Sequence, residues 1–205
     1  ICFLILKGYK NVWGVDVNFE NDPEFKKQIR KINKFIKIII GAKYYEDRIK
    51  VYNGKVLPFK NKSFDLVITQ QVLEHIPSKE IENFILEEKR ILKDDGILYH
   101  QIPHRLVPFE AHTKVWFIHW LPKSLRNLYF KNNKNKLEFI TRHLFLLWPW
   151  QIKSLFIKNS MFVNDITKMR LRNTVYTKEL KGINLILRIC LQKLFIIPVI
   201  GKVLS

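Results

Sequence analysis

The chain has 205 residues, 47% of them hydrophobic and 13% aromatic, which is enough for one globular domain with a sizeable core. Lys and Arg number 36 against 18 Asp and Glu, so the formal charge of +18 indicates either a polyanionic partner or a basic, solvated surface. With only 7 Gly, 8 Pro and two distant cysteines, Cys2 and Cys190, the composition excludes a low-complexity linker and a disulfide framework, and it is typical of a reducing compartment.

The chain opens on an apolar run, residues 1–6, that is too short for a membrane span or a signal peptide. We interpret it as the end of a buried helix whose beginning is missing, and we expect the chain to be a fragment. Residues 12–16 predict a short buried strand that ends in an acid, Asp16. A helix is expected to follow, because Asp22 is a capping residue and Pro23 suits the first helical position.

The next hundred residues continue to alternate between strand and helix. Strands are predicted over 48–52, 64–69 and 97–102. The intervening helix is expected to be capped by Ser78 and stopped by the residues Asp94-Asp95-Gly96. This order predicts an α/β fold, a mostly parallel sheet with helices on both faces, and ligands in such sheets lie at the carboxyl ends of the strands.

The second half is rich in aromatic and basic residues and less regular. It predicts a helix over 150–157 and a strand over 162–166. Residues 181–205 read as an amphipathic helix, broken near Pro198, with a wide apolar face and a narrow basic one. That helix is expected to pack on protein, and contact with a membrane surface is the open alternative.

Four short blocks occur in order along the first half of the chain: Leu57-Pro58-Phe59, then Ser63-Phe64-Asp65, then Leu73-Glu74-His75-Ile76, then Arg90-Ile91-Leu92-Lys93 before Asp94-Asp95-Gly96. Together they resemble the class I S-adenosylmethionine (SAM) dependent methyltransferases of the type-11-like group. The resemblance covers roughly residues 1–105 and implies a Rossmann-like fold.

The resemblance also implies what the chain lacks. The family places a first strand and a glycine-rich loop before the segment that resembles residues 6–16, and no GxGxG occurs here. We therefore expect N-terminal truncation and a fragment that is itself inactive. The expected organisation is a partial SAM-binding core over 1–103, followed by a substrate-side segment with the C-terminal helix over 104–205, both in one domain.

The cofactor-binding residues follow from the strand ends and from the family. A carboxylate at Asp16 accepts hydrogen bonds from ribose hydroxyls. By resemblance, Asn53 and Gly54 meet the adenine, although they equally suit a simple turn. Thr69 and Gln70 leave the next strand where the family contacts the methionine part of SAM.

His75 is the candidate catalytic residue, because a histidine of near-neutral pKa can take a proton from a hydroxyl nucleophile. Some relatives hold a divalent metal with two acids and a histidine in this block. Here Gln71 replaces the first acid, which weakens a site for a hard cation, so no metal is expected. Glu74 is then interpreted as structural.

A stretch rich in histidine and tryptophan follows the last predicted strand. Its candidate substrate-binding residues are His104, Arg105, His112, His119 and Trp120. The spacing matches no zinc motif, so a proton-transfer set and ordinary polar packing both remain open. Such residues suit a planar, sugar-like or acidic acceptor.

The leading hypothesis is an enzyme that transfers a methyl group from SAM to an oxygen, nitrogen or carbon nucleophile of a small-molecule, sugar-like or lipid-linked acceptor. The alternative is a non-catalytic basic protein that keeps the fold and binds a membrane surface or, less favoured, RNA. We expect a cytoplasmic location, with peripheral contact to the inner membrane face through 181–205 as the open variant. The sequence predicts no oligomeric state.

Overall fold

The computed structural model describes residues 1–17, 22–41, 47–167 and 169. The chain divides into two compact units. Unit 1 comprises residues 1–70 and 79–101, and unit 2 comprises residues 71–78 together with the described chain from residue 102 onward. The chain passes to the second unit after Gln101, and residues 71–78 group with that unit as well.

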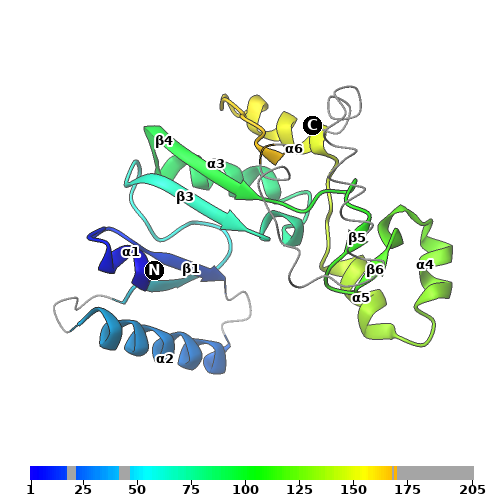
Figure 1. Cartoon of the computed structure of the whole chain (residues 1–205), viewed down its shortest axis with the longest axis horizontal. Helices are drawn as coiled ribbons and strands as arrows, with labels where there is room; N and C mark the ends of the chain where they lie inside the picture. Colours follow the sequence, from blue (N-terminus) through cyan, green and yellow to red (C-terminus); the bar gives the residue numbers. More distant parts are fainter. Residues whose placement is uncertain (18–21, 42–46, 168, 170–205) are drawn as a thin grey trace. The chain divides into compact units, whose positions relative to one another are not determined.

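Unit 1 alternates helix and strand, and its strands form parallel pairs. The elements are α1 (Cys2–Leu6), β1 (Gly14–Val17), α2 (Pro23–Ile40), β2 (Ile49–Tyr52), β3 (Phe64–Gln70), α3 (Ile81–Ile91) and β4 (Leu92–Gln101). β1 pairs with β2, and β3 pairs with β4, both in parallel. No backbone ladder joins these two pairs within the described residues, although the arrows of β1, β3 and β4 point the same way in Figure 1.

Helix α2 begins as its sequence predicts. The Asp22 carboxylate accepts hydrogen bonds from the backbone N–H groups of Glu24 (2.9 Å) and Phe25 (3.4 Å), and Pro23 occupies the first turn. The helix ends at Gly41, whose φ of 86° lies in the region that favours glycine.

A buried asparagine fixes α2 against β2. The Asn33 side chain donates to the Ile49 carbonyl (2.9 Å) and accepts from the Ile49 N–H (2.8 Å). Both backbone groups of Ile49 are therefore satisfied by one side chain, as buried polar groups require. Ile36 and Ile40 on the same helix pack with Ile5 of α1 into one apolar cluster.

One sheet face of the β3–β4 pair is open among the described residues. Leu66 and Ile97 are register partners, and Ile68 follows on the same side of β3. All three are at least half exposed. Large apolar side chains in a row on a parallel sheet are normally covered, because parallel sheets are buried on both faces.

Two expectations about α3 are wrong. The helix begins at Ile81 with no side-chain cap, so Ser78 lies outside it. It ends at Ile91, and Asp94-Asp95-Gly96 do not stop a helix but form an irregularity inside β4, where the pairing passes from Phe64↔Leu92 to Leu66↔Ile97. Such bulges accept residues that favour turns. A Cβ at Gly96 would lie 2.7 Å from Leu92 Cγ, so only glycine fits this bulge without a shift.

Arg90 of α3 connects two of the family motifs within unit 1, its own block and the block Leu57-Pro58-Phe59. Its guanidinium donates to the carbonyls of Leu57 and Phe59 (both 2.9 Å) and forms two bonds of 2.8 Å with the Glu87 carboxylate. Glu87 in turn accepts from the Leu57 N–H at 2.8 Å. The hydrogen bond from Arg90 is the main reason that the pKa of Glu87 is lowered, so the pair stays charged near neutral pH.

We expect Arg90→Ala to lower the free energy of unfolding by about 2–3 kcal/mol, since it leaves the Leu57 and Phe59 carbonyls and a half-buried carboxylate without their donor. Lys27→Ala is the control, because Lys27 makes an exposed pair with Glu24 that contributes at most about 0.5 kcal/mol. Urea denaturation measures both variants. Equal losses in the two would contradict a structural role for Arg90.

Unit 2 holds short helices and one small hairpin. Its elements are the 3₁₀ helices η1 (Leu73–His75) and η2 (Ile118–Trp120), the antiparallel strands β5 (Phe109–Glu110) and β6 (Val115–Trp116), and the helices α4 (Lys123–Tyr129), α5 (Lys134–Arg142) and α6 (Pro149–Lys158). Helix α6 confirms the helix predicted over 150–157. The strand predicted over 162–166 is wrong, because this segment forms no strand and Phe162 is 96% exposed.

The core of unit 2 packs around Ile118, which is fully buried. Phe130 and Ile140 are buried in the same cluster. The amphipathic helix predicted over 181–205 lies outside the described residues. Within the described part of the chain, no helix combines the length and apolarity that crossing a bilayer requires.

Candidate active site

Asp16 lies at the carboxyl end of β1, and the turn Asn53-Gly54 follows the neighbouring strand β2. The register pairs Asp16 with Val51 and Val17 with Tyr52, so the acid and the turn leave adjacent strands at the same end. The exposed Asp16 carboxylate accepts one hydrogen bond from the Val17 N–H at 2.8 Å. Because a carboxylate has about four lone-pair sites, room remains for two ribose hydroxyls.

The turn that follows β2 accounts for an asparagine at position 53 even when no ligand is bound. Its side-chain oxygen accepts from the Lys55 N–H at 3.1 Å, and Gly54 has a φ of 79° that favours glycine. The structure thus shows the turn role, and contact with adenine stays a prediction. Such a contact would use the second lone pair of the Asn53 oxygen or the Gly54 N–H.

Thr69 and Gln70 form the carboxyl end of β3, opposite His100 and Gln101 of β4. The Thr69 hydroxyl lies 2.5 Å from His100 Nδ1, and His100 Nε2 lies 3.4 Å from a Glu88 carboxylate oxygen. Thr69, His100 and Glu88 therefore form a cluster that links the end of β3, a predicted contact for the cofactor, to α3.

The Glu88–His100 contact is not an ion pair. Burial raises the pKa of Glu88, which is 1% exposed, to about 8, and burial lowers the pKa of His100 to about 4. Both groups are therefore neutral near pH 7. Sequence reasoning missed this cluster, although Glu88 occupies a position in the buried stripe of α3 that otherwise holds Ile81, Ile85 and Ile91.

His75, the candidate catalytic residue, lies in unit 2 at the end of η1. Its Nδ1 is 2.6 Å from the His143 carbonyl, which only accepts, so Nδ1 carries the proton. In the neutral ring, Nε2 is then the acceptor that a general base needs. The exposed His75 ring also packs edge-on against the rings of His112 and Phe139, with centroid distances of 5.4 Å and 6.0 Å.

Glu74 beside it is 1% exposed, and burial is the main reason that its pKa is raised. Among the described residues no hydrogen-bond partner reaches its carboxyl oxygens. The structural role that the sequence indicates for Glu74 stays a prediction. No group of three or more His, Cys, Asp or Glu side chains in the described ranges could hold a metal ion.

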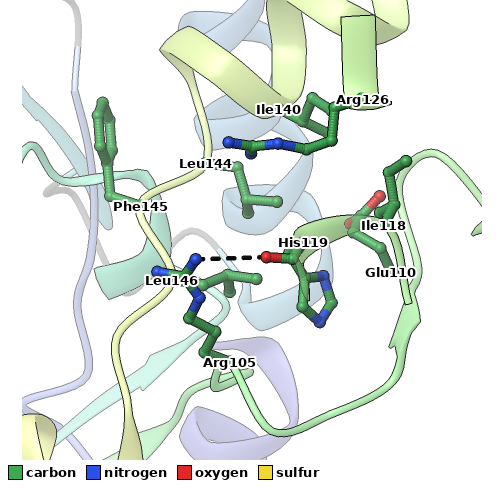
Figure 2. Close-up of a pocket in the computed structure, with 9 residues that line it drawn as sticks. All are labelled: Arg105, Glu110, Ile118, His119, Arg126, Ile140, Leu144, Phe145 and Leu146. Atoms are coloured by element: carbon green, nitrogen blue, oxygen red, sulfur yellow. Dashed lines mark hydrogen bonds between the residues drawn. The ribbon is translucent and has the colours of Figure 1, made fainter. Parts of the chain in front are cut away.

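The predicted substrate residues separate into those that line a cavity and those that support it. Unit 2 contains a cavity of about 220 Å³. Figure 2 shows the residues that line it, which are Arg105, Glu110, Ile118, His119, Arg126, Ile140, Leu144, Phe145 and Leu146. Of the five predicted residues, Arg105 and His119 line it.

The other three have different positions. Trp120 donates from its indole nitrogen to the Arg105 carbonyl at 2.6 Å, so it holds the backbone of a cavity residue. His112 is hydrogen-bonded to a cavity residue, with its Nδ1 atom 2.7 Å from a carboxylate oxygen of Glu110. His104 does not line the cavity, and burial is the main reason that its pKa is lowered.

Arg126 and Glu110 line the same cavity and were not singled out from the sequence. Arg126 lies on α4, more than twenty residues after Arg105, and nothing in its local sequence distinguishes it from other surface basic residues. The sequence signal for Glu110 was stronger, because it is the one acid in the histidine- and tryptophan-rich stretch 104–120, and the structure buries it almost fully.

Alternating helices and parallel strands, with polar residues grouped at the strand ends, define a Rossmann-like α/β domain. Residues 2–100 match the family described as "Methyltransferase domain", which agrees with the class I methyltransferases that the sequence motifs of this part of the chain resemble. The chain is also 30% identical over 134 residues to an uncharacterized protein of Methanocaldococcus jannaschii. That match covers 65% of this chain and 42% of the relative, so the chain spans about two fifths of the relative's length.

Proposed function

We propose that the protein binds SAM at the carboxyl ends of its parallel strands and promotes methyl transfer to an oxygen, nitrogen or carbon nucleophile of a small molecule. The proposal depends on one observation. In a methyltransferase domain, the polar residues Asp16, Asn53 and Gly54 and the pair Thr69 and Gln70 all leave parallel strands at their carboxyl ends, where this fold class binds ligands.

The residues present fit the cofactor in part. The exposed Asp16 carboxylate has lone pairs for the ribose, and the Gly54 N–H would donate to a ring nitrogen of the adenine. Thr69 and Gln70 would contact the methionine part. When bound, SAM supplies an electrophilic methyl group on a positively charged sulfur.

The chain's own contribution to the transfer is positioning and proton removal. Holding the acceptor in line with the methyl group accounts for most of the rate in such reactions. The Nε2 atom of His75 is available to take the proton of a hydroxyl or amine acceptor, because Nδ1 is engaged with the His143 carbonyl.

The glycine-rich loop of the family has no counterpart in the 205 residues, and no ladder joins β1–β2 to β3–β4 among the described residues. The open apolar face of Leu66, Ile68 and Ile97 is of the kind that other protein surface would cover.

The test is calorimetric titration of the full-length protein with SAM, with S-adenosylhomocysteine as competitor and ATP as a control for adenine and ribose alone. We expect saturable SAM binding that S-adenosylhomocysteine abolishes and ATP does not. Binding of RNA or anionic vesicles without any SAM binding would instead support the non-catalytic alternative.

A further inference from the structure

The cavity of unit 2 holds more positive charge than its own residues neutralise. The guanidinium groups of Arg105 and Arg126 both line it, and Glu110 is its one carboxylate among the lining residues. The Arg105 guanidinium lies over the Trp148 ring, with Cζ 5.4 Å from the ring centroid, and it donates to the His119 carbonyl at 3.4 Å. These two contacts fix Arg105 in its position at the edge of the cavity.

Glu110 is already committed to other partners. One of its oxygens accepts from the N–H of His112 (2.9 Å) and faces His112 Nδ1 (2.7 Å), and the other accepts from the N–H and the hydroxyl of Thr113 (both 2.5 Å). These four bonds use about all the lone-pair sites of a carboxylate. Glu110 therefore cannot also form a bidentate pair with either arginine.

Arg126 has unused donor capacity. Its Nε atom is inaccessible to solvent and has no hydrogen-bond partner among the described residues. Because Nε is closed to solvent, a bound molecule would meet the other guanidinium nitrogens of Arg126, whose charge no free carboxylate of the lining residues neutralises. The apolar walls formed by Ile118, Ile140 and Leu144 lower the local dielectric and strengthen any charge pair made there.

His119 lines the same cavity, but its ring nitrogens are not open to a ligand there. Its Nε2 lies 2.5 Å from the Val107 carbonyl and must donate to it, so Nδ1 carries the lone pair of the neutral ring. That Nδ1 is closed to solvent and has no partner among the described residues. The polar groups that the cavity offers to a ligand are therefore its guanidinium donors.

We propose that this cavity binds the anionic group, a carboxylate or a phosphate, of a small molecule through Arg105 and Arg126, and that this molecule is the methyl acceptor. The second half of the statement rests on the proposed function, whereas the anion site does not. A volume of about 220 Å³ is below the roughly 300–1,000 Å³ of sites for drug-sized ligands, so the occupant is a small molecule or the end of a larger one.

The experiment titrates the full-length protein with inorganic phosphate and, separately, with malonate, at constant ionic strength so that general screening does not change. Glycerol is the uncharged control. We expect saturable binding of at least one anion and none of glycerol. The anion that binds more tightly distinguishes a phosphate-bearing from a carboxylate-bearing acceptor.

Arg126→Gln should weaken anion binding by about 10- to 100-fold, the range for losing one or two charge-assisted hydrogen bonds. Arg142→Gln is the matched control, since it removes the same charge from an exposed pair with Glu138 and should leave binding unchanged. Arg126→Lys should give an intermediate loss, because it keeps the charge and loses the forked geometry.

Leu144→Phe provides a second route that alters no charge, because a larger side chain fills the cavity and should also abolish binding. The anion site is wrong if Arg126→Gln and Arg142→Gln bind alike, or if no anion binds saturably. Parallel SAM titrations separate the two proposals. Arg126-dependent anion binding without SAM binding would keep the site and remove the acceptor assignment.

Discussion

Asp16→Ala should weaken SAM binding about 100-fold. The change removes an exposed carboxylate at the carboxyl end of β1, and with it two charge-assisted hydrogen bonds to the ribose. Each such bond contributes about 1.5 kcal/mol at a solvent-accessible site, and about 1.4 kcal/mol corresponds to a tenfold change in affinity. Isothermal titration of the full-length protein measures the effect.

The matched control is Asp65→Ala. Asp65 is also an exposed carboxylate on a strand of unit 1, but it lies near the amino end of β3, where it pairs with Lys93 at 2.6 Å. Its removal should leave SAM affinity unchanged. Asp16→Asn keeps one acceptor oxygen and should fall between the two. Wild-type affinity in Asp16→Ala would remove Asp16 from the cofactor site.

The second large effect is a loss of stability that depends on Glu88 as the pH rises from 6.5 to 8. Its pKa is about 8 in the folded chain against an ordinary value of 4.5, so between these values the unfolded chain releases a proton that the folded chain retains. The free energy of unfolding then falls by about 1.4 kcal/mol per pH unit as the pH rises.

His100 acts in the opposite direction over a lower range. Its pKa is about 4 when folded against an ordinary 6.5, so stability is lost as the pH falls from 6.5 towards 4. The two contributions oppose each other between about pH 4.5 and 6.5. What remains is a fall of about 2 kcal/mol between pH 6.5 and 8, caused by Glu88 alone.

Glu88→Gln isolates this contribution, because the amide has nearly the same shape and does not titrate. We expect urea denaturation to give a variant whose stability changes little between pH 6.5 and 8 and exceeds that of the wild type at pH 8. If wild type and variant lose stability in parallel over this range, then Glu88 is ionised in the folded protein and our account of the cluster is wrong.

The sequence predicted those elements whose signals are local. Asp22 and Pro23 begin α2 as expected, because capping involves only the next few residues. Ser78 and the Asp94-Asp95-Gly96 turn carried equally good local signals, yet α3 starts later and stops earlier. Pairing of Leu92 with Phe64 draws the chain into β4 before the turn residues are reached, and a local pattern contains no information about that partner.

The candidate site divides in a similar way. Asp16, Asn53 and Thr69 could be selected because strand ends are visible in the sequence and the family motifs fix their order. Arg126 and Glu88 could not be selected, because their roles depend on residues that are distant in the sequence. Arg126 lines a cavity together with Arg105, and Glu88 contacts His100.

The unjoined strand pairs have a consequence for cooperativity. Since no ladder hydrogen bond among the described residues runs from β1–β2 to β3–β4, either pair can open without breaking a backbone bond of the other. Asn33 holds the first pair to α2, whereas the Arg90 network and the α3 contacts hold the second. Substitutions in the two pairs should therefore be nearly additive in free energy, and each pair would behave as a separate foldon until a strand between them couples the two.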